Sequence, residues 1–182
     1  MKVALFSKGN LNDHIQIYST VINKLIENKI EIMFHTNFEK PLEHLVAYDI
    51  KNNILENHSD LIENRVDFII SIGGDGTFLN TLIFVKNSNI PVIGINTGRL
   101  GFLANNLVED LDQIIFCLIN KQYSLESRSV IELKSKTSLF KEDNFALNDF
   151  TIHKRDNSSL TAITTFLNGD FFNKYCGVGL IV

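Results

Sequence analysis

The sequence has little cysteine, no tryptophan and no surplus of positive charge. Its two cysteines, Cys117 and Cys176, lie far apart without a CxxC motif, which fits a reducing compartment and argues against a thiolate metal site. The 17 basic residues are outnumbered by 21 acidic ones, so the basic footprint of a nucleic-acid-binding protein is missing. The absence of tryptophan fits an AT-biased coding sequence, and we attach no function to it.

Long apolar runs are also absent. No run reaches the length of a transmembrane helix, and the apolar run at the N-terminus is too short for a signal peptide. The sequence therefore predicts a cytoplasmic protein that binds neither membranes nor nucleic acids. Its 182 residues, 45% of them hydrophobic and 21% charged, suit one large globular domain or one and a half small ones.

The first two thirds of the chain alternate between short apolar runs and amphipathic segments. Strands are predicted at 2–7, 30–35, 66–72 and 90–96, and the uninterrupted run at 66–72 is typical of a strand buried on both faces. Helices are predicted at 11–29, 43–48, 54–62, 77–87 and 107–122. This alternation indicates an open, Rossmann-like α/β domain over residues 1–122.

From residue 123 onward the pattern changes to alternating strands without helices. Asn168-Gly169, between two apolar strands, predicts a hairpin with a type I′ turn. We expect residues 123–182 to begin an all-β sandwich. A unit of this size that ends on the apolar run VGLIV does not close its own core, so we expect the natural chain to continue past Val182 or a partner to supply strands.

The motif GGDGT, at 73–77, follows a buried strand and opens a helix, where open α/β sheets bind ligands. Glycines let the backbone approach a phosphate, and N–H groups at a helix start favour negative charge. The motif is neither GxGxxG nor a Walker A loop. Asp75 can therefore ligate a metal that bridges phosphates, or take a proton from an attacking hydroxyl. The alternative is that Asp75 only caps the helix in a tight turn.

A second loop, GINTGRLGFLA at 94–104, has the same setting at the end of the next predicted strand. Two such loops on neighbouring strands would line one crevice. Arg99 is the cation of this loop and is a candidate for a phosphate contact, although a solvated surface arginine is the commoner outcome.

Four segments, in their order and spacing, resemble the NAD kinase family: GGDGTFLN, GINTGRLGFLA, ALNDFTIHKRDNSSL and YCGVGLIV. The chain is identified as a member of the bacterial ATP-NAD kinase family, truncated within its C-terminal domain. The resemblance implies transfer of the γ-phosphoryl group of ATP, or of polyphosphate in some members, to the adenosine-ribose 2′-hydroxyl of NAD. It further implies a divalent metal such as Mg²⁺, NAD in a crevice between the α/β domain and the sandwich, and a homo-oligomer.

The resemblance also implies roles for residues of the first loop. Asp75 matches the family's proton acceptor at the 2′-hydroxyl. Gly74, Gly76 and Thr77 would form the turn around the phosphates, and Phe78 would lie near the adenine. No metal ligand is assigned.

In the second domain, Asn148 and Asp149 match the pair that holds the ribose and adenine of NAD, and Ser159 falls near the nicotinamide side. Asp149 stands where the family has glutamate, so its reach is shorter by one methylene. Val178 stands where the family has an aspartate, which removes a carboxylate. The alternative function is a non-catalytic NAD- or ATP-binding remnant. A lipid or sugar kinase with a similar turn is disfavoured by NTGRLGFLA and LND.

Overall fold

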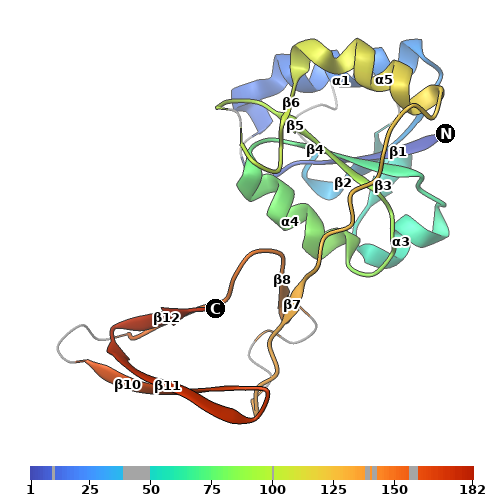
Figure 1. Ribbon diagram of the computed structural model, residues 1–182. Coiled ribbons are helices and arrows are strands. Elements are labelled where there is room, and N and C mark those ends of the chain that lie inside the picture. Colours follow the sequence, from blue (N-terminus) through green and yellow to red (C-terminus); the bar gives the residue numbers. More distant parts are fainter. Residues whose placement is uncertain (10, 39–49, 100, 138–139, 141–142, 156–159) are drawn as a thin grey trace. The chain divides into compact units, whose positions relative to one another are not determined.

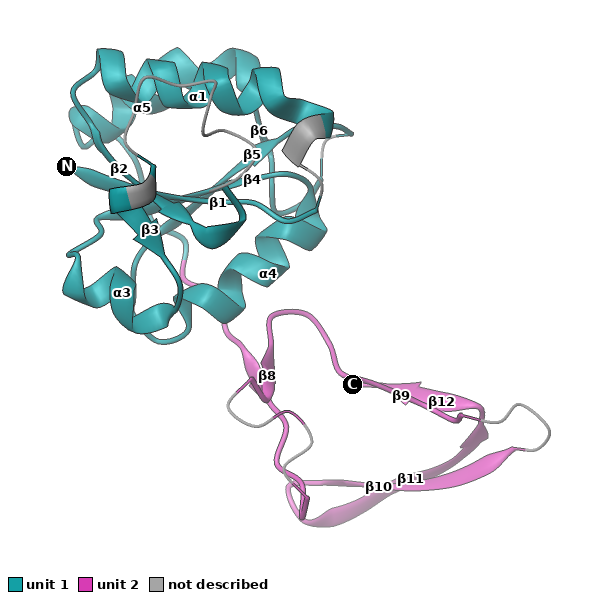
Figure 2. Ribbon diagram, turned by 180° about the vertical axis from the view of Figure 1, so that it is seen from behind, with its two compact units in different colours: residues 1–126 teal, residues 127–182 magenta. Residues whose placement is uncertain are grey.

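The protein is described by a computed structural model that covers residues 1–9, 11–38, 50–99, 101–137, 140, 143–155 and 160–182. These residues form two compact units, unit 1 at 1–126 and unit 2 at 127–182, which Figure 2 shows in different colours. Unit 1 contains a six-stranded sheet, and unit 2 contains three two-stranded sheets. None of the helices in the described ranges is both long and apolar enough to cross a membrane.

Unit 1 alternates strands with helices (Figure 1). Its strands are β1 (Lys2–Phe6), β2 (Glu31–His35), β3 (Ile54–Leu55), β4 (Phe68–Ile72), β5 (Val92–Asn96) and β6 (Asn106–Leu107). Its α-helices are α1 (Ile15–Glu27), α3 (His58–Glu63), α4 (Asp75–Val85) and α5 (Leu111–Ile119). Short 3-10 turns lie at Leu11–His14, Thr36–Phe38, Lys51–Asn53 and Val108–Asp110.

The sheet of unit 1 is parallel throughout, with the strand order β3-β2-β1-β4-β5-β6. The chain moves outward from β1 in one direction and, from β4, in the other. The carboxyl ends of β1 and β4 therefore form the point where the order reverses, which is where ligands bind in open α/β sheets. This arrangement confirms the predicted α/β fold class.

Helices cover both faces of the sheet, with α1 and α5 on one face and α3 and α4 on the other (Figure 1). Alternate residues of β1 supply the two cores, because successive side chains of a strand point to opposite faces. Val3 and Leu5 pack with α1 and α5, whereas Ala4 and Phe6 pack with α3 and α4. The continuous apolar run in β4 follows from this burial on both faces.

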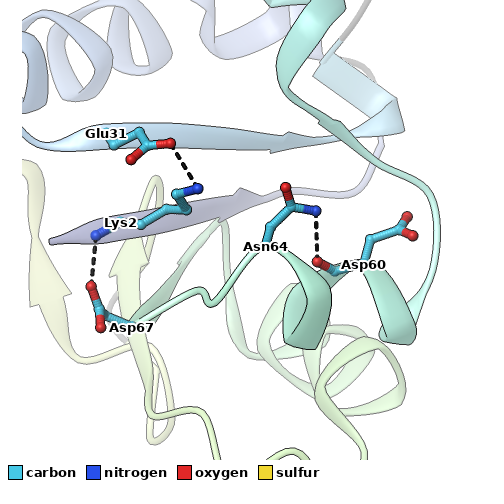
Figure 3. Close-up of polar contacts among 5 residues, drawn as sticks. All are labelled: Lys2, Glu31, Asp60, Asn64 and Asp67. Atoms are coloured by element: carbon cyan, nitrogen blue, oxygen red, sulfur yellow. Dashed lines mark hydrogen bonds and ion pairs between the residues drawn. The ribbon is translucent and has the colours of Figure 1, made fainter.

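Polar contacts tie the amino ends of the central strands together (Figure 3). The Lys2 ammonium lies 2.7 Å from a Glu31 carboxylate oxygen, and the Lys2 backbone N–H donates to Asp67 at 2.7 Å. At the end of α3, the Asn64 amide donates to the Asp60 carbonyl oxygen at 2.8 Å. These contacts lie at the amino ends of the parallel strands, whereas the glycine-bearing loops follow the carboxyl ends.

Two details of unit 1 differ from the sequence prediction. The helix predicted at 54–62 is wrong in its first half, because residues 54–55 pair with β2 as strand β3. Asn57 then caps α3 by accepting from the Ser59 and Asp60 N–H groups, which fixes the helix start at His58. The short strand β6 was not predicted, and the helix predicted at 43–48 lies outside the described residues.

The described residues of unit 2 form strands and no helix. The strands are β7 (Ile131–Glu132), β8 (Phe145–Ala146), β9 (Thr151–His153), β10 (Thr161–Leu167), β11 (Asp170–Gly177) and β12 (Gly179–Ile181). The predicted hairpin is confirmed: β10 pairs with β11, and Asn168 and Gly169 have φ angles of 54° and 96°, as a type I′ turn requires. A complete sandwich, and the domain division at residue 122, stay predictions.

Candidate functional site

The site begins where β4 turns into α4. Gly73 has a φ of 152°, and a Cβ at this position would overlap the side chain of Thr77, so glycine is required by the fold itself. Gly73 also donates its N–H to the Ile95 carbonyl oxygen at 2.9 Å, which joins this turn to β5. The turn is therefore fixed by the strands on which it stands.

Gly74 and Gly76 differ from Gly73, because a Cβ on either would meet no atom within 4 Å. Gly74 is the N-cap of α4, and no side chain caps this helix. Within the described part of the chain, the N–H groups of Gly74, Asp75 and Gly76 have no acceptor. Because glycine has no side chain, the backbone N–H groups at the positive end of α4 are left exposed.

The Asp75 carboxylate binds the second glycine-bearing loop. Its Oδ1 accepts the N–H groups of Leu103 at 3.0 Å and Ala104 at 2.9 Å, and its Oδ2 accepts the N–H of Phe102 at 2.9 Å. The alternative in which Asp75 caps its own helix is therefore wrong. The carboxylate instead links the loop after β4 to the loop after β5.

These hydrogen bonds also set the charge state of Asp75. The N–H groups of Ala104, Phe102 and Leu103 hold its pKa below the ordinary value of 3.8, and desolvation opposes them. Asp75 is consequently an ionised carboxylate at neutral pH.

Two further glycines let the loops approach. A Cβ on Gly101 would overlap the Asp75 carboxylate, so only glycine permits the wrapping of residues 101–104 around it. A Cβ on Gly94 would lie 2.7 Å from the Ala104 Cα and 3.0 Å from the Phe78 ring. Both glycines are therefore explained by packing between the two loops, unlike Gly74 and Gly76.

Two residues beside this site were not singled out from the sequence. The Phe102 side chain is 94% exposed, although its backbone N–H binds Asp75. The Lys8 ammonium, in the loop after β1, donates to the Asn80 side chain at 2.7 Å, and the Asn80 amide donates to the Gly76 carbonyl oxygen at 2.6 Å. The aromatic residue directly after the motif glycine Gly101 was a sequence signal for Phe102, whereas Lys8 is brought near α4 only by the fold.

Comparison with known proteins decides the family. The sequence model of the ATP-NAD kinase N-terminal domain matches residues 3–123, about two thirds of the chain. The chain belongs to the ATP-NAD kinase family. The matched region contains both glycine-bearing loops and the whole parallel sheet.

Individual members of the family are similar along the entire chain. The NAD kinases of Flavobacterium psychrophilum and Cytophaga hutchinsonii are 35% and 37% identical to it, over 184 and 190 aligned residues. Each alignment covers 100% of this chain and 62% of the relative. The chain thus spans about three fifths of the length of these curated NAD kinases.

Solved structures agree with the fold. Yeast NADH kinase, crystallised with NADH, superposes with a TM-score of 0.81 at 21% identity, covering 100% of this chain and 56% of that one. An NAD kinase from Archaeoglobus fulgidus, in complex with ATP, gives a TM-score of 0.67 at 23% identity, covering 100% and 59%.

The other residues expected from the NAD kinase family are distributed over both units. The half-buried Phe78 packs against Gly94 and so faces β5. In unit 2, Asn148 and Asp149 are exposed and precede Phe150, whose N–H donates to the Val182 carbonyl oxygen at 2.7 Å. Their roles toward NAD stay predictions.

Two further predicted positions of the NAD site have different outcomes. Val178 is exposed, and its carbonyl oxygen accepts the Lys154 N–H at 2.8 Å. Ser159 lies outside the described residues.

The described residues do not build a metal site by themselves. No group of three or more His, Cys, Asp or Glu side chains with suitable geometry occurs among them. Asp75 is the acidic residue of the first loop, and its oxygens accept three backbone N–H groups.

Proposed function

We propose that the chain carries the phosphoryl-transfer site of an NAD kinase. The reaction would move the γ-phosphoryl group of ATP to the 2′-hydroxyl of the adenosine ribose of NAD, giving NADP and ADP. The observation that supports this most directly is the position of Asp75, an ionised carboxylate next to three backbone N–H groups at the start of α4 that have no acceptor among the described residues.

The hydrogen bonds of Asp75 suggest which of its atoms would accept the proton. A carboxylate has about four acceptor directions, and Oδ1 already uses two of its own. Among the described residues, Oδ2 accepts only the Phe102 N–H, which leaves one acceptor direction for a further donor. The 2′-hydroxyl proton would pass to Oδ2 while the ribose oxygen attacks the γ-phosphorus and the bond to the β-phosphate oxygen breaks.

The phosphates would lie against the N–H groups of Gly74, Asp75 and Gly76. The open space at Gly74 and Gly76 supports this, because neither glycine is needed for the conformation of the chain itself. Lys8 is linked to this turn through Asn80, whose amide donates to the Gly76 carbonyl oxygen. Its ammonium would add a positive charge on the side of the donor phosphates.

NAD would occupy the other side of Asp75. The complexes of the yeast kinase with NADH and of the Archaeoglobus fulgidus kinase with ATP support both nucleotides as ligands. We place the exposed ring of Phe102 on this side, as a surface on which a base can stack. Asn148 and Asp149 would hold the ribose and adenine, and Ser159 would lie toward the nicotinamide.

The proposed enzyme also uses Mg²⁺ and assembles from several copies of the chain. Mg²⁺ would enter bound to the ATP phosphates, where it neutralises the charge that develops during transfer. A homo-oligomer is the expected assembly of the protein.

The direct test is incubation of the purified chain with NAD, ATP and Mg²⁺ and detection of NADP. Formation of NADP that depends on all three components supports the proposal. A folded sample that forms none, confirmed by circular dichroism, contradicts catalysis by this chain.

A non-catalytic nucleotide-binding role is the second candidate. It is favoured by Asp149 and Val178, which stand where the family has glutamate and aspartate. Calorimetric titration with NAD and with ATP separates the two candidates, because binding without NADP formation supports the second one.

A further inference from the structure

Asn96 is a buried polar residue at the end of β5, with 3% of its surface exposed. Its side chain spans the second loop. Oδ1 accepts the Gly98 N–H at 2.7 Å, and Nδ2 donates to the Ala104 carbonyl oxygen at 3.0 Å. Because one partner is a donor and the other an acceptor, only one orientation of the carboxamide satisfies both.

Ala104 is bound from two sides. Its carbonyl oxygen receives the Asn96 amide, while its N–H donates to Asp75 Oδ1 at 2.9 Å. The same carbonyl oxygen also accepts the Gly101 N–H at 3.4 Å. The turn that holds Asp75 is therefore itself held by Asn96, through a residue that is 1% exposed.

We propose that Asn96 is a positioning residue for Asp75: it keeps residues 98–104 in the conformation whose backbone N–H groups hold the carboxylate. This inference rests on the proposed function, in which Asp75 accepts the ribose proton. Asn96 is buried and does not itself touch a substrate. Its effect reaches the reaction through the N–H groups of Phe102, Leu103 and Ala104, which orient Oδ2 and stabilise its charge.

Charged side chains are not among the causes that shift the pKa of Asp75. Arg99 lies on the same loop, and Lys8 reaches α4 from the loop after β1. Neither is among the causes that shift the Asp75 pKa, which are the three N–H groups and the opposing desolvation. Loosening the loop would remove hydrogen bonds to the charged form, so the pKa of Asp75 should rise toward 3.8.

The test compares Asn96→Ala and the milder Asn96→Ser with the unchanged chain. Asn120→Ala is the matched control, because the Asn120 amide also donates to a backbone carbonyl oxygen, that of Phe116, but on α5. The pKa of Asp75 is measured by ¹³C NMR titration of its carboxyl carbon, and NADP formation is measured in parallel. If Asn96→Ala does not fold, Asn96→Ser alone is compared with the unchanged chain.

We expect both Asn96 variants to raise the Asp75 pKa, while Asn120→Ala leaves it unchanged. In an active chain, we expect kcat to fall about tenfold or more, with the acid limb of the pH profile moved to higher pH. An unchanged Asp75 pKa in a folded Asn96 variant would overturn the inference. Because the titration needs no turnover, an inactive chain would contradict the proposed function without deciding the role of Asn96.

Discussion

The backbone N–H of Ala104 lies 2.9 Å from the Asp75 carboxylate, and this hydrogen bond joins loops that are 29 residues apart in the sequence. The two loops follow strands β4 and β5, which are neighbours in the sheet. Asp75 therefore has two roles in the proposed enzyme, as a link between loops and as a proton acceptor. Substitutions around it test these roles separately.

Asp75→Asn should reduce NADP formation by about a hundred- to ten-thousand-fold, because an amide cannot accept the ribose proton. It should also release part of the second loop, since the asparagine NH₂ group cannot accept a backbone N–H. Steady-state kinetics and amide hydrogen exchange at residues 102–104 measure the two effects. Asp67→Asn is the control, because Asp67 also accepts a backbone N–H, from Lys2, at the opposite edge of the sheet. Retained turnover would remove Asp75 as the base.

Gly101→Ala should displace the Asp75 carboxylate, because the added methyl group would overlap it. Displacement of the carboxylate from its position should lower kcat about ten- to a hundredfold. Gly98→Ala is a matched control in the same loop, since its Cβ would approach only Asn96 Oδ1, at 4.0 Å. Equal kinetics for the two variants would contradict the close wrapping of residues 101–104.

Gly74→Ala should leave thermal stability nearly unchanged, because its Cβ meets nothing within 4 Å. It should weaken ATP binding about ten- to a hundredfold, because the added methyl group would occupy the space proposed for a phosphate and prevent about one hydrogen bond to a charged group. Calorimetry with ATP and thermal unfolding of the same sample measure both effects. A stable variant with unchanged ATP affinity would show that the phosphates do not lie on this turn.

Phe102→Ala should preserve the fold, because the side chain is 94% exposed. Loss of a stacking surface should raise the KM for a nucleotide about five- to a hundredfold and change kcat less. Phe116→Ala on α5, where the ring is 52% exposed, provides a control for removal of a surface aromatic. Unchanged KM values for both NAD and ATP would argue against a nucleotide on Phe102.

His35 should make the stability of unit 1 depend on pH. Its ring lies 4.6 Å from that of Phe6 and 5.0 Å from that of Phe84, and burial lowers its pKa below 6.5. The unfolded chain therefore binds the proton more readily, so the free energy of unfolding should fall as pH drops below 6.5. Denaturant unfolding measured between about pH 5 and pH 8, the range in which histidine titrates, checks this slope.

Removal of the imidazole provides the comparison. His35→Phe should flatten the slope, whereas His14→Gln, at an exposed position before α1, should keep it. An identical slope in His35→Phe would assign the pH dependence to another group.

Much of both units was predictable because the patterns are local. The run that forms β4 is buried on both faces, and the Asn168-Gly169 turn forms a hairpin because both residues adopt positive φ. The start of α3 was missed because residues 54–55 join the sheet as β3, a pairing with β2 that local periodicity does not encode. β6 is only two residues long and leaves too short a pattern to recognise.

The sequence by itself determined the alternation of strands and helices, the glycine-bearing loops and the family that they indicate. The tertiary structure decided what each glycine and the carboxylate do. Gly101 and Gly94 make room for contacts between loops, whereas Gly74 and Gly76 leave backbone donors open. Only the pairing of β4 with β5 brings Asp75 to the N–H groups of residues 102–104, because a hydrogen bond across 27 to 29 residues depends on strand order and not on local sequence.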